Sequence, residues 1–196
     1  MRYTPAIQMS RDSHRNYSLD DYFTVEEMSE IKHEFYQGEI FAMAGASLRH
    51  NEIAANLLTQ FRTRLRDSDC GAYGSDLRIQ TPGGLYTHPD VSVIFDPVQL
   101  VPERSDTAMN PVVLAEVLSE ATEDYDRGEK FALYKTISAF RHYFLISQAE
   151  TLVDYYDRDD EGEWRRKTIR DPNEIIDIRS IGTSFPMHEL YRRAGL

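Results

Sequence analysis

Two acidic residues in apolar surroundings indicate a candidate metal site. Asp90 lies within the alternating segment 86–95, and Glu116 lies inside the apolar run 112–118. A carboxylate on a buried strand is costly unless a cation pairs with it, and two carboxylates on neighbouring strands repel each other. Mg²⁺ or Mn²⁺ would hold both through oxygen ligands, and the backbone carbonyl of Val117 is the further ligand that we predict.

A lysine completes this candidate site. Lys130 lies on a predicted helix, and Tyr134 lies on the same helix face four residues later. A lysine beside a metal can orient or help deprotonate an attacking water and offset charge that develops at phosphorus. The alternative is a solvated helix face on which Asp126 pairs with Lys130. If Lys130 acts in catalysis rather than in folding, Lys130→Ala should change stability by no more than about 1 kcal/mol, because alanine favours helices.

Two other polar residues are weaker candidates. Glu34, near the first predicted helix, is either a carboxylate that supports the metal site or binds a second metal, or a surface acid. His50, at the start of the second predicted helix, either contacts a phosphate or orients a carboxylate, or it simply caps the helix. The arginine-rich segments 62–66 and 165–167 are predicted to be solvated surface. No Cys/His cluster in the sequence has zinc-ligand spacing, and no Gly-rich loop has phosphate-loop spacing.

The predicted elements place these residues in one α/β or α+β domain, residues 21–196, after an N-terminal arm, residues 1–20. Thr24 and Glu27 match a capping box that would open the first helix. The predicted helices cover 24–35, 47–66, 123–137 and 186–193, and the predicted strands cover 40–44, 72–80, 86–95, 112–118, 140–147, 151–156, 164–169 and 174–178.

Composition limits the environment and the partners. The single cysteine, Cys70, excludes an intramolecular disulfide framework and predicts a cytoplasmic protein. No apolar stretch approaches the roughly 20 residues of a membrane span, and the N-terminus lacks the apolar core of a signal peptide. The net charge of −11 opposes nucleic-acid binding unless positive charges cluster or a metal ion intervenes.

Motifs in a fixed order resemble the Uma-type restriction endonuclease family, which belongs to the PD-(D/E)XK nuclease superfamily. The resemblance covers about residues 22–191. It rests on Tyr22-Phe23-Thr24-Val25-Glu26-Glu27, His33-Glu34-Phe35-Tyr36-Gln37-Gly38-Glu39-Ile40, Met43-Ala44-Gly45-Ala46-Ser47-Leu48-Arg49-His50-Asn51, Gly74-Ser75-Asp76, Pro89-Asp90-Val91-Ser92-Val93, Glu116-Val117-Leu118-Ser119, Asp126-Arg127-Gly128-Glu129-Lys130, Tyr134 and Tyr143-Phe144-Leu145-Ile146.

The resemblance implies a restriction-endonuclease-like core, a central mixed β-sheet flanked by helices. It assigns Asp90 as the motif aspartate, Glu116 as the following acid and Glu34 as an acid that supports the metal site. The usual lysine position is Leu118 here, so the resemblance transfers that role to Lys130. It also implies DNA as substrate, Mg²⁺ or Mn²⁺ as cofactor, and a homodimer, because many members of the superfamily pair to cut both strands.

Three functions compete at this stage. The first is a Mg²⁺-dependent endonuclease that hydrolyses DNA phosphodiester bonds, favoured by the complete set of Asp90, Glu116 and Lys130. The second is a catalytically weak or inactive nuclease-fold module for binding or assembly, favoured by the acidic charge. The third is a metal-dependent enzyme on a small phosphate ester, which would need no basic groove.

Overall fold

The computed structural model describes residues 16–196, so residues 1–15 of the predicted arm lie outside the described residues. The elements are α1 (Leu19–Met28), β1 (His33–Tyr36), β2 (Glu39–Ala42), α2 (Leu48–Arg64), β3 (Cys70–Gly74), β4 (Arg78–Gln80), β5 (Tyr86–Thr87), β6 (Val91–Phe95), β7 (Thr107–Ala108), β8 (Pro111–Leu118), α3 (Glu123–Arg127), α4 (Glu129–Tyr134), β9 (His142–Ser147), β10 (Val153–Arg158), β11 (Trp164–Ile169), β12 (Ile175–Ile178) and β13 (Thr183–Pro186). No helix within residues 16–196 is long and apolar enough to cross a membrane.

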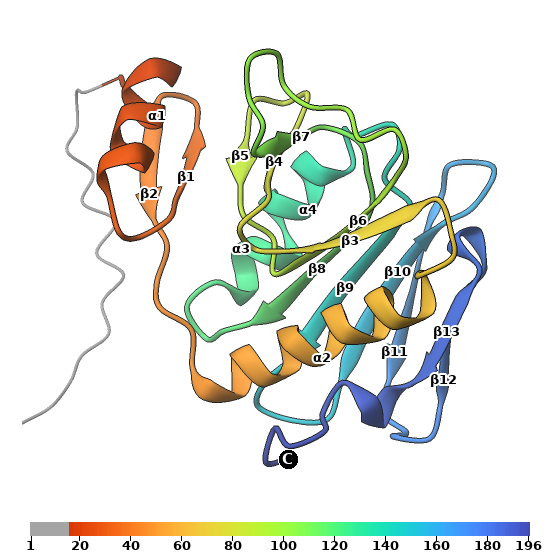
Figure 1. Ribbon diagram of the computed structural model, residues 1–196. Coiled ribbons are helices and arrows are strands. Elements are labelled where there is room, and N and C mark those ends of the chain that lie inside the picture. The colour runs from red at the N-terminus through yellow and green to blue at the C-terminus, as the bar shows by residue number, and fades with distance from the viewer. Residues whose placement is uncertain (1–15) are drawn as a thin grey trace, which may run out of the picture.

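The main sheet confirms the predicted mixed core. Its strand order is β11-β10-β9-β8-β6-β3, and only the β8–β9 pair is parallel. All eight residues of β8 are buried, as expected for an apolar strand covered on both faces. Figure 1 shows α2 crossing one face of this sheet, while α3 and α4 lie beyond the other.

The alternation of β8 decides where Glu116 points. Val113, Ala115 and Val117 belong to the core beneath α2, whereas Leu114 and Leu118 belong to the second core, with α4. Successive side chains of a strand point to opposite faces, so Glu116 points toward α3 and α4.

A second, smaller sheet has the order β2-β1-β5-β4-β7 and lies beside α3 and α4 in Figure 1. It forms because two predicted strands are each divided between the sheets. Segment 72–80 turns at Ser75 and Asp76, so β3 joins the main sheet and β4 the small one. Segment 86–95 breaks at Pro89 and Asp90 in the same way, because proline cannot donate a ladder hydrogen bond. Each prediction of one continuous strand was therefore wrong.

The predicted first helix was also wrong in its position. Helix α1 begins after Ser18, whose side chain accepts a hydrogen bond from the Asp21 backbone, while the Asp21 carboxylate accepts one from the Ser18 backbone. This capping box competes with the predicted one, and the Thr24 hydroxyl instead donates to the Asp20 carbonyl inside the helix. Residues 33–36, predicted as the helix end, form β1.

Two later helices are shorter than predicted, whereas α2 begins after Ser47 as predicted, with that side chain capping the His50 backbone. Predicted helix 123–137 breaks at Gly128, where a Cβ atom would lie 3.0 Å from the Asp124 carbonyl oxygen. Predicted helix 186–193 contains only a 3₁₀ turn, Met187–Glu189, because β13 extends to Pro186.

Candidate active site

Glu116 is the buried centre of the candidate site. Its Oε1 atom accepts a 2.7 Å hydrogen bond from the Tyr134 hydroxyl and lies 3.0 Å from Lys130 Nζ. Burial raises the pKa of Glu116 to about 8, and the negative charges of Asp126 and Asp90 add to this, although Lys130 opposes it. A further positive charge beside Glu116 would therefore lower this pKa and favour the carboxylate form.

Lys130 connects three carboxylates. Its Nζ atom lies 2.9 Å from Glu34 Oε1, 3.0 Å from Glu116 Oε1 and 3.4 Å from Asp126 Oδ1. The side chain is only 5% exposed, so the alternative of a solvated helix face was wrong. Burial alone would lower the pKa of Lys130, but Glu116 and Glu34 outweigh it and raise that pKa well above its ordinary value. Lys130 is therefore a fixed ammonium group.

Glu34 reaches the site from the other sheet. It lies on β1, it is buried, and its Oε1 atom accepts a hydrogen bond from the Thr87 hydroxyl of β5. Burial opposes its ionisation, but Lys130 and Thr87 outweigh burial and lower the pKa of Glu34. Glu34 is therefore an ionised, buried carboxylate, and the surface-acid alternative was wrong.

Asp90 lies at the edge of the site, immediately before β6. Its Oδ2 atom accepts a 2.7 Å hydrogen bond from the Val117 backbone N–H, and its Oδ1 atom lies 2.8 Å from His50 Nε2. The backbone N–H and C=O of one strand residue point to the same side, so the Val117 carbonyl also faces Asp90. Asp90 and His50 are each 17% exposed at the side chain, more than the buried carboxylates beside Lys130.

Asp126 belongs to this cluster, although it was not among the predicted site residues. It is buried, and burial raises its pKa although Lys130 opposes that shift. The sequence feature that could have indicated Asp126 is Gly128. This glycine breaks the helix, so Asp126 and Lys130 enter the core from two short helices. The neighbouring Arg127 fixes α3 to the main sheet through a 2.6 Å ion pair with Asp154 of β10.

The chemistry of the donors fits a hard divalent cation at Asp90 and Glu116. Both offer carboxylate oxygens, and within residues 16–196 Glu116 contacts protein groups through Oε1 alone. A cation beside Glu116 would favour its ionised form, because burial raises its pKa to about 8. Within residues 16–196, no three His, Cys, Asp or Glu side chains are grouped closely enough to form a metal site by themselves.

Comparison with known proteins gives the family. Residues 19–187 match the Uma2 family, described as "Putative restriction endonuclease". This chain belongs to the Uma2 family. Two relatives from Synechocystis sp. are "Uncharacterized protein slr1290", 38% identical over 89% of this chain and 91% of the relative, and "Uncharacterized protein sll1609", 32% identical over 81% and 90%.

A solved structure supports the fold of this Uma2 chain. The crystal structure of a "putative nuclease belonging to DUF820" from Anabaena variabilis is similar with a TM-score of 0.69, over 85% of this chain and 93% of that one. The two sequences are 16% identical, so this similarity concerns the fold. The predicted family and the predicted α/β core are both confirmed.

Proposed function

We propose that this chain is a Mg²⁺- or Mn²⁺-dependent endonuclease that hydrolyses phosphodiester bonds of DNA. The observation that carries the proposal is the position of Lys130, whose buried ammonium contacts both Glu34 and Glu116. Leu118 occupies the usual lysine position of the superfamily, and α4 supplies an ammonium to the same carboxylate from elsewhere in the chain. The membership in the Uma2 family supports the same reaction class.

Asp90, Glu116 and the Val117 carbonyl would hold the cation in this proposal. When bound, Mg²⁺ would supply positive charge to a phosphate oxygen and acidify a water molecule. His50 orients Asp90 through its 2.8 Å contact, and Tyr134 orients Glu116 through its hydroxyl. Because its pKa is raised, Lys130 keeps its proton. Its proposed role is to orient the attacking water and offset negative charge at phosphorus, rather than to remove a proton.

A cavity lies at the end of β8, although Asp90, Glu116 and Lys130 do not line it. It has a volume of about 860 Å³ and is lined by residues that include Ser47, Leu118 and Ser119. Leu118 ends β8, two residues after Glu116, and Ser47 caps the helix that carries His50.

One specific observation favours a catalytically weak or inactive module for binding or assembly. Glu34, Glu116 and Lys130 are almost completely buried, so the substrate must displace part of the small sheet or enter from the side of Asp90. The net charge of −11 also opposes long-range attraction of DNA.

A pair of substrates separates these functions. Purified protein with Mg²⁺ or Mn²⁺ is incubated with supercoiled plasmid and, separately, with bis(p-nitrophenyl) phosphate. Nicked or linear plasmid supports the proposed nuclease. Hydrolysis of the small ester alone supports the small-phosphate enzyme, and an intact plasmid that is nevertheless retarded by the protein supports the binding module.

We further propose that a homodimer forms for cleavage of both strands. Sedimentation velocity of the full chain tests this directly. A monomer at all accessible concentrations would contradict it, and linear plasmid formed without a nicked intermediate would support it.

A further inference from the structure

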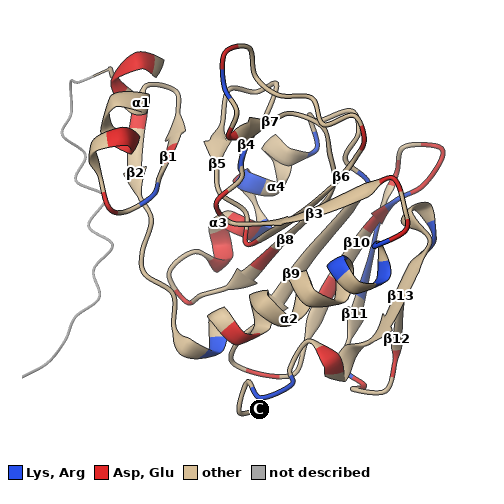
Figure 2. Cartoon of the chain, viewed as in Figure 1, with Lys and Arg blue, Asp and Glu red and all other residues tan. Residues whose placement is uncertain are grey.

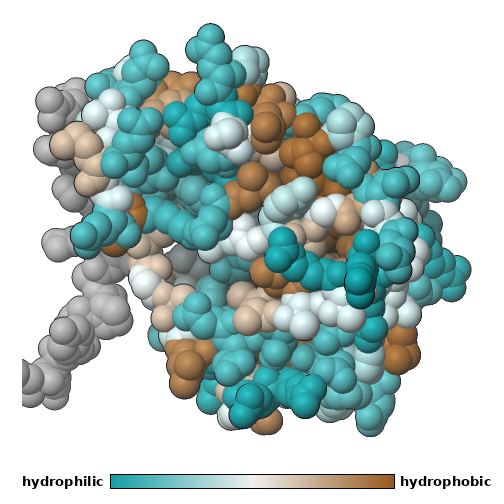
Figure 3. Space-filling model, in the orientation of Figure 1, coloured by the Kyte–Doolittle hydropathy of each residue, from teal (hydrophilic) through white to brown (hydrophobic). Residues whose placement is uncertain are grey.

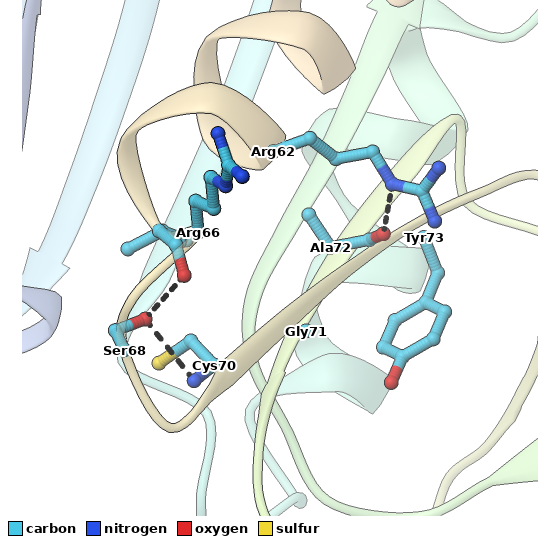
Figure 4. Close-up of a pocket in the computed structure, with 8 residues that line it drawn as sticks. Arg62, Arg66, Ser68, Cys70, Gly71, Ala72 and Tyr73 are labelled. Carbon is cyan, nitrogen blue, oxygen red and sulfur yellow. Dashed lines mark hydrogen bonds between the residues drawn. The ribbon is translucent and has the colours of Figure 1, made fainter.

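We propose that a pocket at the C-terminal end of α2 binds a backbone phosphate of the nucleic acid, remote from the scissile bond. This inference rests on the proposed function for the identity of the ligand. The pocket has a volume of about 310 Å³ and is lined on one wall by Arg62 and Arg66 and on the other by Gly71 and Tyr73. Figure 4 shows the Arg62 side chain extending from α2, Arg66 just beyond the end of that helix, and the Tyr73 ring extending from β3.

The arginines of this segment carry charge that the protein does not neutralise. Among the described residues, no acidic side chain lies within ion-pair distance of Arg62, Arg64 or Arg66, and all three are exposed. Asp67 and Asp69 follow in the turn but form no ion pair with them. Figure 2 shows this basic end of α2 within a largely acidic chain.

The second arginine-rich segment provides the contrast. Arg165 pairs with Asp159 at 2.8 Å, Arg166 with Asp154 at 2.9 Å, and Lys167 with Glu174 at 2.5 Å. Every cation of segment 165–167 therefore has an acidic partner within the protein. This agrees with the prediction that the segment is solvated surface. Of these two segments, 62–66 is the one whose described cations form no ion pair with an acid of the chain.

The pocket also fixes one of its arginines in place. Arg62 Nε donates a 3.2 Å hydrogen bond to the Ala72 carbonyl on β3, the edge strand of the main sheet. Its two terminal nitrogens have no hydrogen-bond partner in residues 16–196, so they can donate to a ligand. Arg66 lies in the turn that follows α2, and its side chain lines the same pocket.

The opposite wall is formed by the Tyr73 ring. A Cβ atom at residue 71 would lie 2.4 Å from the Tyr73 hydroxyl oxygen, so Gly71 lets the ring lie over this part of β3. The Tyr73 hydroxyl is a further possible donor to a phosphate. The simpler role of the arginines, to complement the negative end of the helix dipole, explains neither the fixed Arg62 guanidinium nor the pocket.

The surrounding surface is compatible with a polar ligand. The face shown in Figure 3, which carries α2, is predominantly hydrophilic with dispersed hydrophobic groups. Along α2, His50 and Arg62 are separated by about 18 Å at 1.5 Å per residue. That separation corresponds to roughly five base-pair steps of a duplex that follows the helix. The pocket would then hold a phosphate well outside the candidate active site.

The test compares the two arginine segments in one binding assay. Fluorescence anisotropy with a labelled 20-base-pair duplex is measured in Ca²⁺ over a range of salt concentrations. We expect Arg66→Ala to weaken binding about fivefold and Arg62→Ala/Arg66→Ala about twentyfold, with a salt slope lower by roughly 0.9 because one phosphate contact is lost. The matched controls Arg165→Ala and Arg170→Ala should bind as the wild type does.

Each other outcome overturns the inference. Unchanged duplex affinity in Arg66→Ala, which loses no internal hydrogen bond and should fold normally, contradicts it. Equal losses in the controls show a diffuse charge effect. If inorganic phosphate binds the wild type by calorimetry while duplex affinity is unchanged in the double variant, the pocket takes a free phosphate instead. Plasmid cleavage is scored separately, so its absence contradicts the nuclease and leaves the binding comparison valid.

Discussion

The carboxylate of Asp90 accepts a 2.7 Å hydrogen bond from the backbone N–H of Val117, the residue that follows Glu116. This bond holds the turn before β6 against the end of β8. It lies beyond Ala115, which is the last β8 residue that pairs with β6. It therefore places the two acids that we propose as metal ligands at one end of the same strand pair. The cation that we propose would lie at this strand end, held by both carboxylates and the Val117 carbonyl oxygen.

Loss of either carboxylate should abolish binding of the divalent cation. We expect Asp90→Asn and Glu116→Gln each to remove Mn²⁺ binding measured by calorimetry, because each change removes one anionic oxygen ligand. The control is Glu150→Gln, which alters an exposed acid paired with Arg170. Binding that persists unchanged in both site variants would exclude this pair as the metal ligands.

Removal of Lys130 should reduce stability far more than the sequence alone predicts. Lys130→Met leaves Glu34, Glu116 and Asp126 buried without their shared cation. We expect the free energy of unfolding to fall by about 3 kcal/mol in urea denaturation, the scale for breaking a buried ion pair. The earlier expectation of about 1 kcal/mol applies to an exposed helix position.

A double variant tests whether that loss is electrostatic. Glu116→Gln removes one of the carboxylates that Lys130 neutralises, so Lys130→Met/Glu116→Gln should be more stable than the sum of the single effects by about 1–3 kcal/mol. Additive effects would mean that Lys130 stabilises the fold by packing alone. The exposed Lys135, which lies over the Phe131 ring, provides a matched lysine whose replacement should cost little.

The hydrophobic pattern predicted the central strand of the main sheet, and a capping residue predicted the start of the helix that covers it. The apolar run 112–118 could be assigned because a strand covered on both faces must be apolar throughout, and Ser47 could be assigned as a cap because its side chain needs only local geometry. Glu116 was recognisable because it is the only acid in that run. Its metal-binding role stays a prediction.

The division into two sheets could not be predicted from these patterns. Segments 72–80 and 86–95 alternate throughout, but alternation says nothing of which sheet each half joins. Glu34 meets Lys130 only because the small sheet folds against α4, a long-range arrangement. Asp126 was overlooked for a similar reason, since an acid four residues before a lysine is usual on solvated helices.

Acid should destabilise the fold through a histidine outside the candidate site. His142 is buried on β9, where its Nδ1 atom lies 2.8 Å from the Tyr155 hydroxyl, and burial lowers its pKa to about 4. The unfolded chain takes up this proton near pH 6.5, before the folded chain does. The contribution is therefore fully present above pH 6.5 and is lost as pH falls toward 4, by about 3 kcal/mol.

The comparison with His142→Gln isolates this effect from the titration of other groups. Urea denaturation of both proteins between pH 7 and pH 4 should show the wild type losing more stability than the variant, because glutamine does not titrate. Parallel loss of stability in the two proteins would show that His142 is protonated in the folded state with an ordinary pKa.

The rate of DNA cleavage under single-turnover conditions tests the central claim most directly. The measurement uses a supercoiled plasmid, saturating Mn²⁺, and folded samples of the wild type, Lys130→Ala and the matched control Lys135→Ala. We predict that the wild type and Lys135→Ala cleave at equal rates and that Lys130→Ala is slower by at least roughly tenfold. Equal rates for Lys130→Ala and the wild type, or an intact plasmid with all three proteins, would contradict the proposal that Lys130 serves a nuclease site.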